Sequence, residues 1–108
     1  MTPAEYRQQN SMDLTIDEIN EMVTIFKALG SKTRLRILSI LTRSENLPVS
    51  TVSEMLSMSI SRVSHHLSLL ENLGFVEARQ EGKQVFHYIS DDCIIDIMRR
   101  ARGHVAGD

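Results

Sequence analysis

The chain has 108 residues, of which 42% are hydrophobic and 24% charged, and this is the size and composition of one folded domain. No apolar run approaches the ~20 residues of a membrane-spanning helix, and the first thirty residues lack the apolar segment of a secretory signal. The single cysteine cannot form an internal disulfide, so we exclude membrane and disulfide-stapled proteins and expect a cytoplasmic location.

The net charge of −2 argues at first against nucleic acid, but the charges are unevenly distributed. Residues 1–31 carry two basic and five acidic side chains, whereas residues 32–90 carry seven basic and five acidic ones. The stretch 55–70 contains an arginine and two histidines and no acid. Because binding to phosphates requires a local positive surface rather than a basic total, the middle of the chain is a candidate for nucleic-acid binding.

The N-terminal part of the chain predicts a polar arm followed by a helix. Residues 1–13 are polar, and we expect them to form a flexible arm. Thr15 and Glu18 match the capping box that begins a helix, and apolar residues then recur at helical spacing. We expect Gly30 to end this helix in the left-handed conformation that glycine tolerates.

Three further helices follow, and two of them are joined by a tight turn. Ser31 is expected to cap the second helix, and after a turn at residues 44–48 Pro48 is expected in the first turn of a short third helix. A turn at residues 57–59 comes next, and Ser59 is a suitable N-cap for the fourth helix. The inner stripe expected on this fourth helix consists of Ile60, Val63, Leu67 and Leu70. Its outer face is polar and basic, which is typical of a helix-turn-helix.

After Gly74 the hydrophobic period changes from that of a helix to that of a strand. This change predicts strands at residues 75–80 and 85–89, joined by a turn at 81–83. A hairpin directly after the second helix of a helix-turn-helix is a wing.

The last helix is expected to start near Asp91, and residues 104–108 are expected to form a flexible tail. The sum of these elements predicts a mainly helical α+β domain over residues 14–103. Its expected architecture is a winged helix-turn-helix of order α-α-α-α-β-β-α.

Several segments resemble the ArsR/SmtB-type repressors in order and spacing, over roughly residues 15–103. The segments are FKALG (26–30), TRLRIL (33–38), SISRVSHHL (59–67), LENLGFV (70–76) and GKQVFHY (82–88). The resemblance implies a homodimer joined by the first and last helices. It also implies a repressor that binds double-stranded DNA at a palindromic operator. Many members of the family leave DNA when a metal or an oxidant binds.

The recognition helix and the wing supply the residues expected to meet DNA. Arg62 can bind a guanine edge or a phosphate, and Ser61 and Ser64 are short donors. Ile60 is apolar where the family often has a polar residue, so it either contacts a thymine methyl or packs inward. The full set of expected contacts is Ser59, Ile60, Ser61, Arg62, Ser64 and His65 in the helix, and Arg79, Lys83 and Gln84 in the wing.

Other basic side chains are expected to be less important for DNA binding. His65 and His66 point ~100° apart on a helix, so one should face DNA and the other should pack or meet solvent. Arg34 and Arg36 are expected to be solvated surface residues.

The family's two usual kinds of metal site are poorly matched. The third helix, residues 49–56, has no cysteine or histidine. The positions of the last-helix site in the family register are Asp92, Ile94, Val105 and Asp108. Without an imidazole, these would hold a borderline metal poorly. The sequence therefore predicts no cofactor and no metal site of these kinds, and the effector is unknown.

A shifted register of the last helix leaves an alternative open. It gives Asp91, Cys93 and His104, with Gly107 at the fourth position, and three of these could meet as ligands across a dimer. Cys93 could instead act as an oxidant-sensing thiol whose resolving partner lies in the other subunit.

Two other classes of function compete with that of a DNA-binding regulator. An enzyme is not expected, because no nucleophile–base–orienter set and no phosphate-binding glycine loop are present. A winged-helix protein-interaction module is an alternative, since such folds are reused. The polar, acid-free surface from Ser59 to His65 favours DNA.

Overall fold

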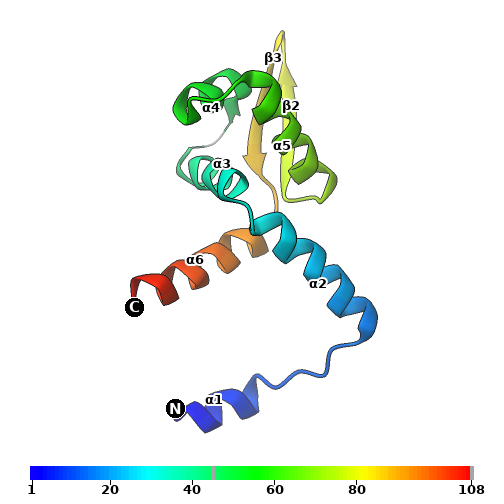
Figure 1. Ribbon diagram of the computed structural model, residues 1–108, viewed down its shortest axis with the longest axis vertical. Coiled ribbons are helices and arrows are strands. Elements are labelled where there is room, and N and C mark those ends of the chain that lie inside the picture. Colours follow the sequence, from blue (N-terminus) through cyan, green and yellow to red (C-terminus); the bar gives the residue numbers. More distant parts are fainter. Residues whose placement is uncertain (45, 108) are drawn as a thin grey trace.

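The structure is a computed structural model that describes residues 1–44 and 46–107. Its helices are arranged around a small antiparallel sheet (Figure 1). The helices are α1 (Pro3–Gln9), α2 (Ile16–Leu29), α3 (Lys32–Arg43), α4 (Val49–Leu56), α5 (Ile60–Asn72) and α6 (Asp92–Ala106). The strands are β1 (Leu47–Pro48), β2 (Val76–Glu81) and β3 (Gln84–Ile89). The predicted winged helix-turn-helix is confirmed, with two short elements, α1 and β1, in addition.

One core lies where α3, α4 and α5 pack against one another and against the hairpin. The largest fully buried side chains are Ile37, Leu38, Val52, Val63, Leu67, Leu70, Val76 and Ile94. They come from α3, α4, α5, β2 and the first turn of α6. Val63, Leu67 and Leu70 of the stripe predicted on α5 therefore lie in this core, which fixes the orientation of the helix.

The predicted caps hold at three helix starts, but one helix ends differently. Thr15 and Glu18 form the capping box, and the hydroxyls of Ser31 and Ser59 accept hydrogen bonds from backbone N–H groups in the first turns of their helices. Gly30 ends α2 as predicted, yet its φ of −77° is not left-handed, so that part of the prediction was wrong. The chain passes straight into the extended Ser31 N-cap of α3, so a left-handed residue is not needed there.

The turn between α4 and α5 is held by two serines. Ser57 ends α4 in the left-handed conformation, with φ 53°. The buried Ser53 hydroxyl donates a hydrogen bond to the carbonyl of Met58. These features fix the short turn, and the direction in which α5 leaves it follows from them.

The hairpin has a shorter turn than the sequence predicted. The last pair of the β2–β3 ladder is Glu81 opposite Gln84, so only Gly82 and Lys83 form the turn. Gly82 has a φ of 62°, which two-residue hairpin turns favour and which glycine adopts readily. The predicted turn at 81–83 was therefore one residue too long.

β1 was not predicted, and it changes the role of Pro48. Leu47 of β1 lies opposite His87, and the sheet order is β1-β3-β2. Pro48 belongs to this edge strand just before α4, not to the first turn of the helix. An edge strand tolerates proline because one side of it makes no ladder hydrogen bonds. Of the turn predicted at 44–48, Glu45 lies outside the described residues.

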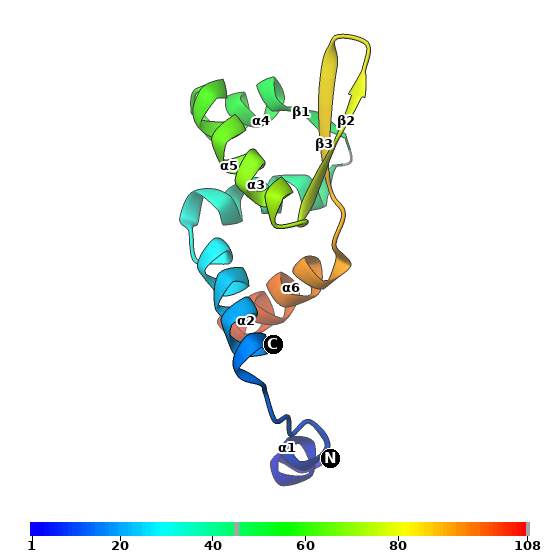
Figure 2. The same ribbon diagram turned by 90° about the vertical axis from the view of Figure 1, so that its right-hand side faces the viewer.

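Both ends of the chain are more helical than predicted. The arm at residues 1–13 contains α1, capped by Thr2, and Figures 1 and 2 show this helix apart from the rest of the molecule. α6 continues into the predicted tail and ends at Gly107, which is left-handed with φ 81°; Asp108 lies outside the described residues. Both α2 and α6 leave the underside of the helix-turn-helix (Figures 1 and 2).

Replacing a core residue of α5 should cost far more stability than replacing its exposed neighbour. Leu67 is 1% exposed and Leu69 is 39% exposed on the same helix. Leu67→Ala should lower the free energy of unfolding by about 2–5 kcal/mol, because it leaves a cavity, whereas Leu69→Ala should lower it by less than about 1 kcal/mol. Urea unfolding at one protein concentration measures both; equal losses would contradict this packing of α5.

Candidate nucleic-acid interface

The outer face of α5 carries the side chains predicted to meet DNA. Val63, Leu67 and Leu70 are buried, which turns Ser61, Arg62 and His65 outward; these three are exposed and Ser64 is half-buried. The Ser59 hydroxyl caps the helix by accepting from the Arg62 N–H, and its own hydrogen is still able to donate. The helix thus presents one polar and basic surface along its first turns.

Ile60 does not pack inward with the rest of its predicted stripe. It is 51% exposed, so its assignment to the inner stripe was wrong. The reason is its place at the first position of α5, about 10 Å along the helix axis from Leu67 and beyond the edge of the core. An exposed apolar residue at the start of this helix remains available to a partner.

Arg62 is the principal free cation of this surface. Among the residues that the structure describes, its guanidinium has neither a hydrogen-bond nor an ion-pair partner. Arginine offers a planar fork of donors that matches a guanine edge or a phosphate. No described residue competes with such a partner for this side chain.

The two adjacent histidines differ in exposure, since His65 is exposed and His66 is half-buried. Nδ1 of His66 is buried without a hydrogen-bond partner in the described part of the chain. Burial lowers the pKa of His66, and the nearby positive charges of Arg34, His65 and Arg62 lower it further. His66 therefore favours the neutral form, and His65 carries the outward-facing imidazole.

Arg34 is not a solvated surface residue, contrary to the sequence interpretation. Its Nε donates to the carbonyl of Ala28 at 2.7 Å, and its Nη2 donates to the carbonyl of Lys27 at 3.2 Å. These are free carbonyls at the end of α2, so Arg34 fastens α2 to α3. The signal for it in the sequence was a basic residue soon after a helix end.

The wing carries the remaining predicted contacts. Lys83 lies in the turn at its tip and Gln84 begins β3, and both are exposed. Arg79 forms an ion pair with Glu81 at 3.1 Å, so its charge is shared within the hairpin. Figure 1 shows the hairpin projecting beyond α4 and α5, where its tip is accessible.

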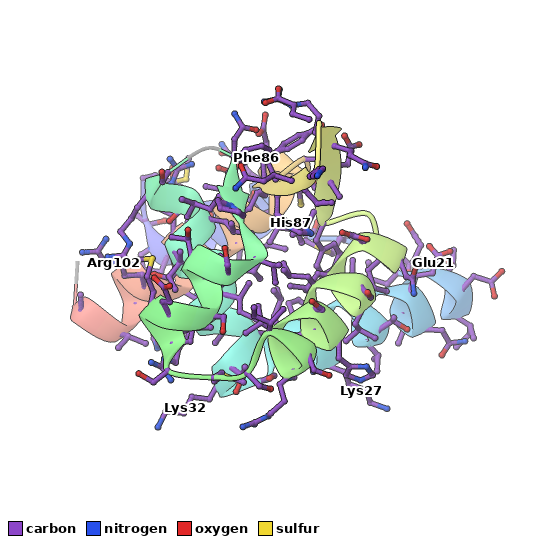
Figure 3. The ribbon with its side chains drawn as sticks, turned by 90° about the horizontal axis from the view of Figure 1, so that it is seen from above. Glu21, Lys27, Lys32, Phe86, His87 and Arg102 are labelled. Carbon is purple, nitrogen blue, oxygen red and sulfur yellow. The ribbon has the colours of Figure 1, made fainter. Side chains whose placement is uncertain are left out.

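His87 connects the wing to the recognition helix, and the sequence interpretation missed it. Its Nε2 lies 3.2 Å from Oε1 of Glu71 near the end of α5, and the residue is 6% exposed. Figure 3 places His87 where the hairpin meets the helices. Strand alternation could have revealed it, because His87 shares a face with Val85 and Ile89.

The candidate effector residues are not brought together within one chain. The Asp91 side chain caps α6 by accepting from the Cys93 N–H at 2.9 Å, and Cys93 is an exposed free cysteine. Cys93 and His104 are about 16 Å apart along α6. Within residues 1–44 and 46–107, no group of three His, Cys, Asp or Glu side chains could hold a metal ion. Of the positions that correspond to the family's metal site on the last helix, Ile94 is buried, and Asp108 lies outside the described residues.

None of the helices in the described ranges is long and apolar enough to cross a membrane.

Known proteins resemble this chain in sequence and in fold. The sequence profile of the family described as "Bacterial regulatory protein, arsR family" matches residues 31–78, which hold the helix-turn-helix. An uncharacterized HTH-type transcriptional regulator of Methanocaldococcus jannaschii is 36% identical over 84 residues, covering 78% of this chain and 94% of that protein.

Two solved structures extend the likeness. The AntR antimony-specific transcriptional repressor is 27% identical, has a TM-score of 0.83, and the match covers 99% of this chain and 94% of that one. A homodimeric winged helix-turn-helix DNA-binding domain from Mycobacterium bovis, a possible ArsR-family regulator, is 24% identical with a TM-score of 0.77. That match covers 90% of this chain and 89% of the other, and it is a likeness of fold.

The lowered pKa of His66 makes stability depend on pH in a defined direction. As pH falls below about 6.5, the unfolded chain binds a proton at this histidine before the folded chain does, so the folded state loses stability. The loss stops once pH has passed the lower pKa of the folded state.

His66→Gln should remove this part of the pH dependence. As the pH falls from about 7.5 to about 5.5, the variant should therefore lose less free energy of unfolding than the wild type, as urea unfolding would measure. His104→Gln, on the exposed end of α6, is the control for loss of a histidine. If both variants follow the wild-type pH dependence, His66 does not titrate as described.

Proposed function

The chain belongs to the arsR family of bacterial regulatory proteins, and on that premise we propose that it represses transcription by binding a palindromic operator as a homodimer. As a member of this family it is a DNA-binding transcriptional regulator. The observation that carries the proposal is the outer face of α5 from Ser61 to His65, a polar and basic surface in a stretch without acids. Its place of action is then the cytoplasm, where the DNA lies.

The first turns of α5 enter the major groove in this proposal. Arg62 binds a guanine edge or a phosphate, and Ile60 contacts a thymine methyl. The serines and the histidine of the surface donate to phosphates or base edges; these are Ser59, Ser61, Ser64 and His65. In the wing, Lys83 and Gln84 meet phosphate or the minor groove, and Arg79 joins them if it exchanges Glu81 for a phosphate.

An exposed apolar stripe along α2 supports the homodimer. Ile16, Ile19, Val23 and Phe26 recur at helical spacing and are 72%, 40%, 42% and 53% exposed. Burial of such a surface is favourable by about 25 cal/mol per Å². A second copy can cover the stripe if α2 and α6 of both copies pack together, which is the predicted contact of the first and last helices of the domain. The Mycobacterium bovis domain of the same fold is homodimeric.

A two-fold dimer sets the form of the operator. Two copies of α5 placed one helical turn of DNA apart, ~34–36 Å, read the same half-site in opposite directions. The operator is therefore a palindrome, and selection of bound sequences from random duplexes would identify it.

The regulator in this proposal has no metal site of the usual family kinds. Asp91 is engaged as a helix cap, and Cys93 and His104 lie far apart on one α6. The alternative is a metal- or thiol-responsive repressor whose site combines Asp91 and Cys93 of one subunit with His104 of the other. AntR, the solved repressor of similar fold, is antimony-specific. The two versions differ in whether zinc, nickel, arsenite or an oxidant changes operator binding.

Arg62→Ala should weaken operator binding and lower either its sequence discrimination or its dependence on salt. If Arg62 reads a guanine, the variant should lose about 1–3 kcal/mol of discrimination at that base pair; if it grips a phosphate, the salt slope should fall by about one unit. Arg7→Ala on α1 makes the same charge change away from α5 and is the control. Fluorescence anisotropy over a range of salt concentrations measures both. An Arg62→Ala protein with unchanged affinity, specificity and salt slope would overturn the assignment.

Phe26→Asp should weaken the dimer at least about tenfold, because it places a charge in the apolar contact. Thr24→Asp adds the same charge on nearly the opposite side of α2 and should leave association unchanged. Sedimentation equilibrium measures the dissociation constants. A dimer equally stable in both variants would show that the stripe on α2 is not the interface.

A further inference from the structure

A groove between α3 and α4 lies outside the surfaces assigned to DNA and to the dimer. It is an open groove of about 410 Å³, lined by α3 from Lys32 to Arg43 and by the last two residues of α4, Met55 and Leu56. Ligand sites in proteins commonly have volumes of about 300–1,000 Å³. The groove is thus large enough for a small organic molecule.

The floor of this groove is apolar and partly uncovered. Leu35 is 39% exposed and Met55 is 49% exposed, whereas Ile40 and Leu56 beneath them are buried. A flexible methionine at the edge of an apolar surface adapts to ligands of different shape. An alkyl or aromatic group would gain free energy by leaving water here.

The rim is cationic. Lys32, Arg36 and Arg43 all line the groove, and no acid among the residues that the structure describes lines it. Their spacing of four and seven residues places them on one side of α3. Within the described residues, none of the three has an ion-pair partner. A ligand that lies on the apolar floor therefore meets unpaired positive charges at the edge.

We propose that this groove binds a small organic anion with an apolar tail, such as a medium-chain carboxylate. Arg36, in the middle of the rim, can hold the carboxylate with two parallel hydrogen bonds. The tail lies along Leu35 and Met55. Figure 3 places Lys32, at one end of the groove, on the opposite side of the molecule from Phe86 of the wing.

The groove is placed to influence DNA binding, a consequence that rests on the proposed function. Met55 and Leu56 end α4 directly before the turn at Ser57 that leads into α5. An anion in the groove that favours one arrangement of this turn over another would change the affinity of α5 for its operator. The anion is then the effector of this regulator, in place of a metal ion.

The test uses decanoate, below its micelle concentration, with the ¹⁵N-labelled full chain and no DNA. We expect saturable shifts of the amide signals of α3 and of the end of α4. Arg36→Gln should weaken binding at least about tenfold, since it removes a charge-assisted bidentate contact, and decanamide should bind wild type similarly weakly. Arg100→Gln on α6 is the matched control and should bind like wild type. Shifts confined to α2 and α6, or equal binding by Arg36→Gln, would overturn the proposal.

A second measurement separates this proposal from the proposed function. Operator affinity of wild type and Arg36→Gln is measured without decanoate, over a range of salt concentrations. Equal affinities with equal salt slopes support the ligand site. Weaker binding with a shallower slope would show that the rim contacts phosphates, and it would overturn the ligand site while the DNA-binding function stands.

Discussion

Burial of one face of α5 is the constraint on which the rest of the structure depends. Val63, Leu67 and Leu70 are packed into the core, and this fixes the rotation of the helix about its axis. Arg62, Ser61 and His65 face outward as a direct result. The outward polar surface therefore needs no special scaffold of its own. Its orientation is a by-product of hydrophobic packing, and the cap at Ser59 sets only where it begins.

The interface is connected to the rest of the molecule by a few polar contacts. Arg34 joins the end of α2 to α3 and lies close enough to His66 of α5 to influence its charge. On the other side, His87 of β3 meets Glu71 of α5. The helix that supplies the apolar stripe and the strand that supplies the wing are thus each linked to the recognition helix. A change in the packing of α2 can reach α5 through these side chains.

Much of the fold could be predicted because its signals are local. The caps at Thr15, Ser31 and Ser59 and the change of hydrophobic period after Gly74 each depend on a few neighbouring residues. What could not be predicted depends on partners distant in sequence. β1 is a strand only because His87 and Phe86 lie opposite it, and the roles of the buried His87 and of Arg34 follow from contacts with other elements. The exposure of Ile60 depends on where the core ends, which periodicity does not reveal.

The sheet order gives the wing an uneven stiffness. β3 lies between β1 and β2 at Phe86 and His87, but from Gln84 to Val85 it is paired with β2 alone. The hairpin is therefore supported on both edges of β3 in its middle and on one edge only toward Gly82 and Lys83, so its tip is the more flexible part. The tip can therefore adjust its position when the hairpin meets another surface, while the part of β3 at His87 keeps its contact with Glu71 of α5.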